Sequence, residues 1–282
     1  MKLRVSLVLL PSMFLISCSL PALESQLQQP ASSQIVSSIK AGKPFLYEDY
    51  AKTLKAYVND EGLVNYAALQ QNRESLDRFN ATVAAVPADV YAGWSEPEKL
   101  AFLMNAYNSL TLQAIIDQKP LKGSIRDITG VWDITKFQVA GEKKTLNDIE
   151  HGTIRKSFNE PRIHAALVCA AMSCPILRNE PYTSEKVEAQ LDEQVKTWLA
   201  QPESGFKIDR QNKAVFLSKI FDWYGDDWKP SYAVEGKFGG NEKERAVLNF
   251  ISNYLSPEDK AYLEQGDYQV KYLGYDWALN KQ

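Results

Sequence analysis

The chain has 282 residues, of which 45% are hydrophobic and 24% are charged. These proportions are ordinary for a globular protein, and they exclude a disordered chain, a coiled coil, a collagen and a polytopic membrane protein. The 32 basic residues against 35 acidic ones give a net charge of −3. That balance provides no cationic field to hold nucleic acid, so we expect no nucleic-acid partner.

The N-terminus predicts a lipoprotein signal peptide over residues 1–17. Two basic residues precede an apolar run at residues 5–16, which is too short to span a bilayer. The run leads into Leu-Ile-Ser-Cys at residues 15–18, which resembles the bacterial lipobox. This resemblance implies cleavage before Cys18 and acylation of its sulfur by chains such as palmitate. Ser19 in the next position favours the outer membrane of a Gram-negative bacterium, with the protein facing the periplasm. An ordinary secretory signal that happens to contain this cysteine is the alternative.

Residues 18–43 are rich in Ser, Gln and Pro, a composition that buries too little apolar surface to order itself. We interpret them as a flexible tether between the membrane and one globular domain, residues 44–282.

In chain order, apolar residues at helical spacing predict helices over residues 47–58 and 69–86. The helix predicted over residues 95–117 is the best defined, because Ser95 and Glu98 form a capping-box pattern around Pro97. Later helices are predicted over residues 146–155, 182–199, 218–224 and 245–254.

Strand patterns are fewer. They lie at residues 137–140, in a hairpin of 206–208 with 214–217, and at 268–275. Because helices dominate and the strands do not alternate with them, we expect an α+β fold. The prediction is a helix-rich single domain with a small antiparallel sheet.

The side chains best suited to nucleophilic, metal-binding or near-neutral acid–base chemistry are pooled in one short stretch. The sequence has three Cys and two His. Both His and the two Cys other than Cys18 lie within residues 151–174, next to Glu150. The candidate catalytic residues are Cys174, Cys169, His164, His151, Glu150 and Asn105.

A cysteine nucleophile is the first of three hypotheses for this stretch. A thiolate requires a nearby imidazolium or a helix N-terminus, and the imidazole requires a third group to orient it. Glu150, Asn105 or Asn108 would orient His164 or His151. We prefer Cys174 as the nucleophile, because the break at Pro175 allows it to fold back.

The other two hypotheses are a disulfide and a metal site. Cys169 and Cys174 are the pair available in an oxidising compartment, and a bond over so short a loop would pin a local turn. Two His and two Cys also match the ligands of zinc, but their spacing is not that of a usual zinc site. We therefore expect no metal and no cofactor.

Amide and aromatic side chains carry two interpretations each. Asn105 and Asn108 share one face of the predicted buried helix. They are interpreted either as members of a satisfied polar network or as groups that orient an imidazole or donate to an oxyanion. Trp132, Trp223, Trp228 and Trp277 are interpreted as core or cleft wall, with a carbohydrate platform as the alternative.

Five blocks in order resemble the family called domain of unknown function 547 (DUF547). They are FLMNAYNSLT at 102–111, TLNDIEHG at 145–152, PRIHAALVC at 161–169 continuing to SCP at 173–175, LSKIFDWY at 217–224 and YLGYDWALN at 272–280. The resemblance implies one unit over roughly residues 50–280. The family has no settled activity, so the resemblance names no reaction. Similar domains occur in plant proteins outside any oxidising compartment, which weakens a purely disulfide role for the two cysteines.

Two functions are therefore expected. The first is a membrane-anchored periplasmic cysteine hydrolase or acyl transferase acting on a peptide or another envelope component, for which a papain- or transglutaminase-like architecture is a fold-level analogy. The second is a non-catalytic envelope protein that binds peptide, glycan or a partner and contains a Cys169–Cys174 disulfide.

Overall fold

The computed structural model describes residues 44–282. The signal peptide, the acylation site Cys18 and the tether predicted over residues 1–43 lie outside the described residues. Within residues 44–282, no helix combines the length and apolar character needed to cross a membrane.

The first half of this region is built mostly of helices. Its elements are α2 (Glu48–Tyr57), α3 (Tyr66–Gln71), α4 (Glu74–Ala85), α5 (Ala88–Ala92), α6 (Glu96–Ile116), the 3-10 helix η1 (Ile125–Asp127), β1 (Phe137–Val139), β2 (Glu142–Lys144), α7 (Leu146–Ile149), the π-helical turn η2 (Glu150–Ile154), α8 (Arg155–Ser157) and α9 (Ile163–Ala166).

The second half contains helices and a three-stranded sheet. Its elements are α10 (Val187–Leu199), β3 (Phe206–Asp209), β4 (Ala214–Leu217), α11 (Lys219–Tyr224), the 3-10 helix η3 (Gly225–Trp228), α12 (Lys229–Tyr232), α13 (Glu242–Ser252), α14 (Pro257–Gln265) and β5 (Gln269–Tyr272). With mostly helical content and two small sheets, the fold is α+β, as predicted.

Helix α6 forms the centre of the first hydrophobic core. It begins with the predicted capping box, in which the Ser95 side chain accepts from the Glu98 N–H and the Glu98 carboxylate accepts from the Ser95 N–H. The helix is buried on nearly all sides rather than on one face, so its polar residues need internal partners. Asn108 illustrates this: its amide donates to the Ala166 carbonyl (2.9 Å) and accepts from the Val168 N–H (2.9 Å).

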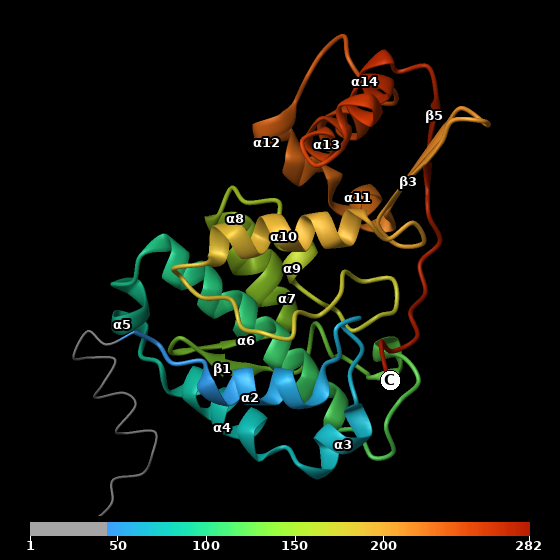
Figure 1. Cartoon of the computed structure of the whole chain (residues 1–282). Coiled ribbons are helices and arrows are strands. Elements are labelled where there is room, and N and C mark those ends of the chain that lie inside the picture. Colours follow the sequence, from blue (N-terminus) through green and yellow to red (C-terminus); the bar gives the residue numbers. More distant parts are fainter. Residues whose placement is uncertain (1–43) are drawn as a thin grey trace, which may run out of the picture.

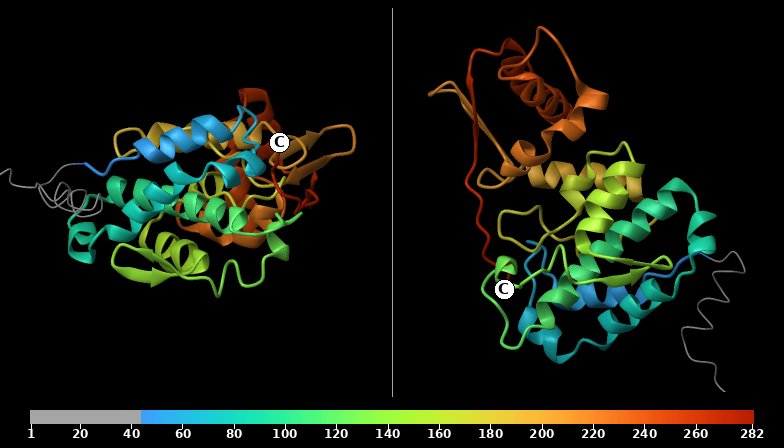
Figure 2. Two further views of the ribbon diagram at one scale, coloured as in Figure 1. Left: turned by 90° about the horizontal axis from the view of Figure 1, so that it is seen from below. Right: turned by 180° about the vertical axis from the view of Figure 1, so that it is seen from behind.

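A second hydrophobic core gathers around Trp198, Phe221, Trp228 and Phe250. The C-terminal segment, residues 273–282, leaves this second part after β5 and returns along one edge of the molecule to the first part (Figures 1 and 2). There Leu279 joins the first core. The chain therefore connects the two cores twice, once where it passes from the first part to the second and once through residues 273–282.

The sheets differ from the expectation in one respect. Strands β1 and β2 pair antiparallel, as do β3 and β4, but β5 pairs parallel with β4. The prediction of an all-antiparallel sheet is therefore wrong at this strand. The reason is that α11 to α14 intervene between β4 and β5, and a long crossover allows a parallel return that a short turn does not.

Three predicted helices have different bounds. Helix α13 begins at Glu242 rather than at residue 245, because Asn241 caps it there. The 69–86 pattern is interrupted, because the side chain and N–H of Asn72 both donate to the Ala68 carbonyl and end α3 before α4 starts. The helix predicted from residue 182 begins only at Val187. Tyr182 cannot join it, because its N–H and C=O are both bonded to the Asn105 amide.

Helix α14 was missed, although Ser256 caps its start and the left-handed Gly266 ends it.

We predict that Asn108→Ala lowers the free energy of unfolding by about 2–4 kcal/mol, because two buried backbone groups lose their partners. Chemical denaturation of the purified protein measures the change. Asn159→Ala is the matched control, since that amide is exposed and makes one bond, to Ser231; its effect should stay within about 0.5 kcal/mol. Equal effects of the two substitutions would contradict this role of Asn108.

Candidate functional site

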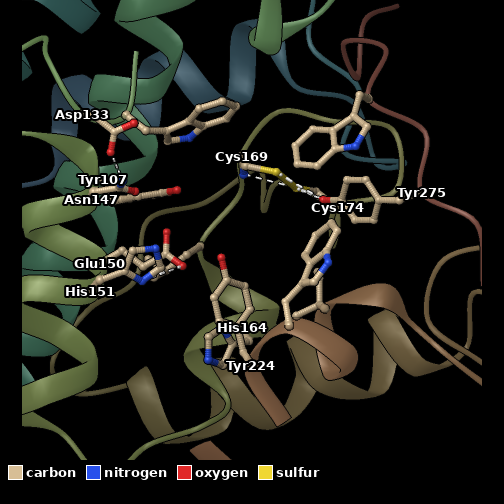
Figure 3. Close-up of a pocket in the computed structure, with 15 residues that line it drawn as sticks. Tyr107, Asp133, Asn147, Glu150, His151, His164, Cys169, Cys174, Tyr224 and Tyr275 are labelled. Carbon is tan, nitrogen blue, oxygen red and sulfur yellow. Dashed lines mark hydrogen bonds and ion pairs between the residues drawn. A yellow bond between two sulfur atoms is a disulfide. The ribbon is translucent and has the colours of Figure 1, made fainter. Parts of the chain in front are cut away.

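A pocket of about 310 Å³ lies between α6, α7, η2, the Cys169–Cys174 loop, α11 and the C-terminal segment (Figure 3). Its volume is at the lower end of the range for small-molecule sites. Its lining residues are Tyr107, Trp132, Asp133, Asn147, Glu150, His151, His164, Leu167, Cys169, Cys174, Ile220, Trp223, Tyr224, Tyr275 and Trp277.

Five of the six candidate catalytic residues line this pocket: Glu150, His151, His164, Cys169 and Cys174. Asn105 is not among the lining residues, because its amide binds the backbone of Tyr182. Asn108 also lies outside the lining and fixes the chain that leads to Cys169. The catalytic roles of the six residues stay predictions.

The local sequence explains how Glu150 and His151 reach the pocket. Helix α7 starts with a capping box between Thr145 and Asp148, and it continues directly into the π-helical turn η2. A π turn adds one residue to the helical repeat and redirects the side chains at its start, which is why such turns are frequent at functional sites. Glu150 is buried there, whereas His151 is about one-third exposed at its side chain.

The two cysteines are joined as a disulfide, with their Cα atoms 6.4 Å apart. Cys169 is partly exposed and Cys174 is buried. The Tyr275 hydroxyl lies 3.3 Å from the Cys169 sulfur and 3.1 Å from the Cys174 sulfur. The Cys169 N–H donates to the Cys174 sulfur at 3.2 Å. The hydrogen-bonding partners of the sulfurs are therefore a phenol and a backbone amide rather than an imidazole.

The zinc alternative finds no support in the geometry. Within the part of the chain that the structure describes, no group of three or more His, Cys, Asp or Glu side chains is arranged to hold a metal ion.

His164 is held by an acid that the sequence did not indicate. Its Nε2 donates to Asp227 (2.8 Å), and the imidazole stacks between Tyr224 and Trp228 with its side chain only 2% exposed. Asp227 also accepts two bonds from Arg155, at 2.6 and 2.7 Å. Burial alone would raise the pKa of Asp227, but the bonds from His164 and Arg155 outweigh burial and hold that pKa well below its usual range.

Arg155 also reaches the second imidazole. Its guanidinium lies 3.2 Å from His151 Nδ1, whereas the nearest Glu150 oxygen lies 3.8 Å from the same nitrogen. Because a guanidinium only donates, a hydrogen bond between these two groups has Nδ1 of His151 as the acceptor, and in the neutral imidazole this places the proton on Nε2. Both imidazoles are thus connected through Arg155 and Asp227.

One wall of the pocket is aromatic. The indoles of Trp223 and Trp277 stack with centroids 5.7 Å apart, and Trp132 meets Trp277 edge-on at 6.3 Å. Tyr275 packs on both Trp223 (4.8 Å) and Trp277 (4.6 Å). Trp223 lines the pocket and is 41% exposed, so part of its side chain is accessible to solvent.

Sequence reasoning missed Asp227, Arg155 and Tyr275. Asp227 follows α11 in a Gly-Asp-Asp-Trp stretch that matches no motif. It lies 63 residues after His164, so no local pattern connects the two. Tyr275 lies within the last block of the family resemblance, which was the available signal for it.

We predict that Asp227→Asn lowers the free energy of unfolding at pH 7 by about 1.5–3 kcal/mol, because bonds to a charged acceptor weaken. The folded-state pKa of Asp227 is depressed, so its stabilisation is complete above the unfolded-state pKa of about 3.9 and is lost as the pH falls further. The difference in free energy of unfolding between wild type and variant should therefore stay constant from pH 7 to about pH 5 and begin to narrow below about pH 4.

Asp226→Asn is the matched control for that experiment. Asp226 is the neighbouring residue, but it is exposed and pairs only with Lys229, at 3.2 Å. Its removal should change stability by less than about 1 kcal/mol. A pH-independent loss in Asp227→Asn, or an equal loss in both variants, would exclude the proposed charge network as the cause.

Comparisons with known proteins give one match. Neither the curated proteins nor the solved structures contain a significant match to this chain. The papain- or transglutaminase-like architecture therefore stays an expectation. A family model described as "Protein of unknown function, DUF547" matches residues 91–199. This segment holds Glu150, both His and the disulfide, whereas the sequence blocks at 217–224 and 272–280 lie outside it. Residues 91–199 are thus similar to a family that has no described activity.

Proposed function

We propose that this protein is a membrane-anchored binding protein of the bacterial envelope, whose pocket takes one ring of a saccharide. The observation that carries the proposal is the division of the pocket into an aromatic wall and a polar wall. Aromatic rings attract the C–H faces of sugars, and carboxylates and amides bind their hydroxyl groups.

The aromatic wall supplies the stacking surface. Trp223 and Trp277 are stacked on each other, which fixes both indoles before a ligand arrives. A rigid aromatic surface gives binding energy without a large loss of side-chain entropy. The exposed position of Trp223 leaves its ring available at the pocket entrance.

The polar wall supplies acceptors and a donor. Glu150 and His151 lie on one side of the pocket, opposite the disulfide and Tyr275 in the view of Figure 3. Arg155 lies at Nδ1 of His151, so in the neutral imidazole Nε2 carries the proton and can donate. The Asn147 amide is oriented by a hydrogen bond to Asp133. Carboxylate, imidazole and amide together match the alternating donors and acceptors of a sugar ring.

The envelope location rests on the N-terminal sequence and on the disulfide. Disulfides persist in oxidising compartments such as the periplasm, and the lipobox-like residues 15–18 would supply the anchor. Several acyl chains on one cysteine give stable membrane attachment, whereas a single chain gives marginal attachment.

A cysteine hydrolase or acyl transferase is the second candidate. The observation that favours it is that Glu150, both His and both Cys line one pocket. In this mechanism the reduced Cys174 or Cys169 would attack a carbonyl and an imidazole would pass the proton to the leaving group. The thiols are joined, however, and their nearest polar partner is Tyr275, so this activity requires prior reduction and a movement that brings an imidazole to a sulfur.

We predict that N-acetylglucosamine binds to the oxidised protein and that Trp223→Ala weakens its affinity about tenfold, because one stacking surface is lost. Glu150→Gln should weaken binding by a similar factor, since a hydroxyl bond to a carboxylate is replaced by one to a neutral amide. Isothermal titration calorimetry measures both, with the dipeptide Ala-Ala as a second probe.

Glu142→Gln is the control for the Glu150 substitution, since Glu142 is exposed and lies on β2 outside this pocket. Binding of Ala-Ala but not of the sugar would overturn the saccharide assignment in favour of a peptide site. Hydrolysis of an acyl ester that requires a reductant and disappears in Cys174→Ser or Cys169→Ser would establish the second candidate instead.

We predict that Cys18→Ser moves the protein from the membrane fraction to the soluble fraction and abolishes incorporation of a palmitate analogue. Cys169→Ser is the matched control, because it removes a different cysteine and leaves the acylation site intact. Persistent membrane attachment of Cys18→Ser without acyl incorporation would rule out the lipid anchor.

A further inference from the structure

We propose that the Cys169–Cys174 disulfide is a thiol-exchange centre that oxidises small dithiols entering the pocket. This activity goes beyond ligand binding and does not depend on it. The geometry that points to it is a disulfide on the wall of a pocket, with its two cysteines unequally exposed and with a backbone N–H in addition to the Tyr275 hydroxyl at the sulfur of the more buried one.

The two sulfurs differ in access. Cys169 is partly exposed, whereas Cys174 is only 4% exposed. Exchange begins with attack by a thiolate on one sulfur, and the attacked sulfur must be reachable. An incoming thiol in the pocket therefore attacks Cys169, and Cys174 becomes the leaving group.

The leaving sulfur is the one best supplied with donors. Cys174 Sγ accepts from the Cys169 N–H at 3.2 Å and lies 3.1 Å from the Tyr275 hydroxyl. Burial raises the pKa of Tyr275, so its hydroxyl stays protonated and acts as a donor. Stabilisation of the leaving thiolate lowers its pKa and accelerates its departure.

Backbone hydrogen bonds hold the loop between the two cysteines in addition to the disulfide. Ala170, Met172 and Ser173 are hydrogen-bonded to the C-terminal segment, at 3.0 Å to the Asn280 N–H, 2.8 Å to the Ala278 carbonyl and 3.2 Å to the Asp276 carbonyl. These bonds also hold Ala170 at φ +64°, a conformation that costs a non-glycine residue about 1–3 kcal/mol and clusters at functional sites. Reduction would therefore leave the two thiols close together and ready to be joined again.

The exchange is balanced for one dithiol per disulfide and leaves both cysteines reduced. The first thiolate of the dithiol bonds to Cys169 Sγ as the Cys169–Cys174 bond breaks, and Cys174 takes up a proton after leaving as a thiolate. The second thiolate of the dithiol then attacks the other sulfur of the same molecule, which is bonded to Cys169. Cys169 leaves as a thiolate and is protonated. The dithiol loses two electrons and two protons, which end on the two cysteines.

The test uses the full chain, oxidised, with dithiothreitol as the dithiol under native conditions. We expect stoichiometric reduction at a rate that does not follow the rate of global unfolding. Tyr275→Phe should slow reduction about tenfold, because the leaving thiolate loses one hydrogen bond. Tyr272→Phe is the matched control, since its hydroxyl bonds Glu244 at 3.0 Å and lies outside the pocket. Quenched alkylation followed by intact mass measures the rate.

Single-cysteine variants separate exchange from a structural role. Cys174→Ser, which retains the accessible Cys169, should form a mixed disulfide with hydroxyethyl disulfide, whereas Cys169→Ser should form it at least tenfold more slowly. Tyr275→Phe should also shift the pH profile of Cys174 alkylation in Cys169→Ser to higher pH. The other titratable groups that face the pocket, which are Asp133, Glu150, His151, His164, Tyr107 and Tyr224, remain in both backgrounds.

Three results would overturn the proposal: reduction that proceeds only as fast as global unfolding, equal rates in Tyr275→Phe and Tyr272→Phe, or equal trapping at the two cysteines. None of them bears on saccharide binding, which is measured on the oxidised protein. Failure of the saccharide titration would likewise leave the exchange experiment unaffected.

Discussion

The arrangement of the pocket depends on backbone hydrogen bonds between the C-terminal segment and loops of the first core. Leu279 donates to the Gly123 carbonyl (3.0 Å), Val64 donates to the Asn280 carbonyl (2.8 Å), and the loop between the two cysteines pairs with residues 276–280. The same segment carries Tyr275 and Trp277 into the pocket. Because these bonds span nearly the whole described chain, the pocket forms only when both cores have folded and the end of the chain has docked.

Charge placement imposes a second constraint. Asp227, from the second half of the chain, accepts from both Arg155 and His164, which belong to the first half. This partly buried carboxylate is stabilised because both donors pair with it, and loss of either donor would leave one of its hydrogen bonds unmade. His164 is therefore committed to Asp227 and to its stacking partners. This commitment separates it from the sulfurs, which interact with Tyr275 instead.

Local signals in the sequence predicted the elements well where capping and periodicity agree, as in α6, α11 and the β3–β4 hairpin. They failed where tertiary hydrogen bonds override propensity: Tyr182 is held out of α10 by Asn105. For the site, the scarcity of His and Cys was sufficient to find four lining residues, and Glu150 was found as the neighbour of His151. Asp227 and Arg155 are common residue types in ordinary surroundings, and only the fold brings them to His164. The parallel pairing of β5 is likewise a property of the topology, which no local pattern encodes.

Tyr275 connects the two walls on which the functional proposals rest. Its ring packs on Trp223 and Trp277, the surface proposed for stacking, while its hydroxyl contacts both sulfurs. A ligand stacked on this wall would restrict the ring whose hydroxyl stabilises the leaving thiolate, and it would cover the approach to Cys169. Coupling between two sites is reciprocal, so reduction of the disulfide must change ligand affinity by the same factor by which the ligand changes the equilibrium of reduction. Tyr275 would thus couple binding of a ligand in the pocket to the redox state of the Cys169–Cys174 disulfide.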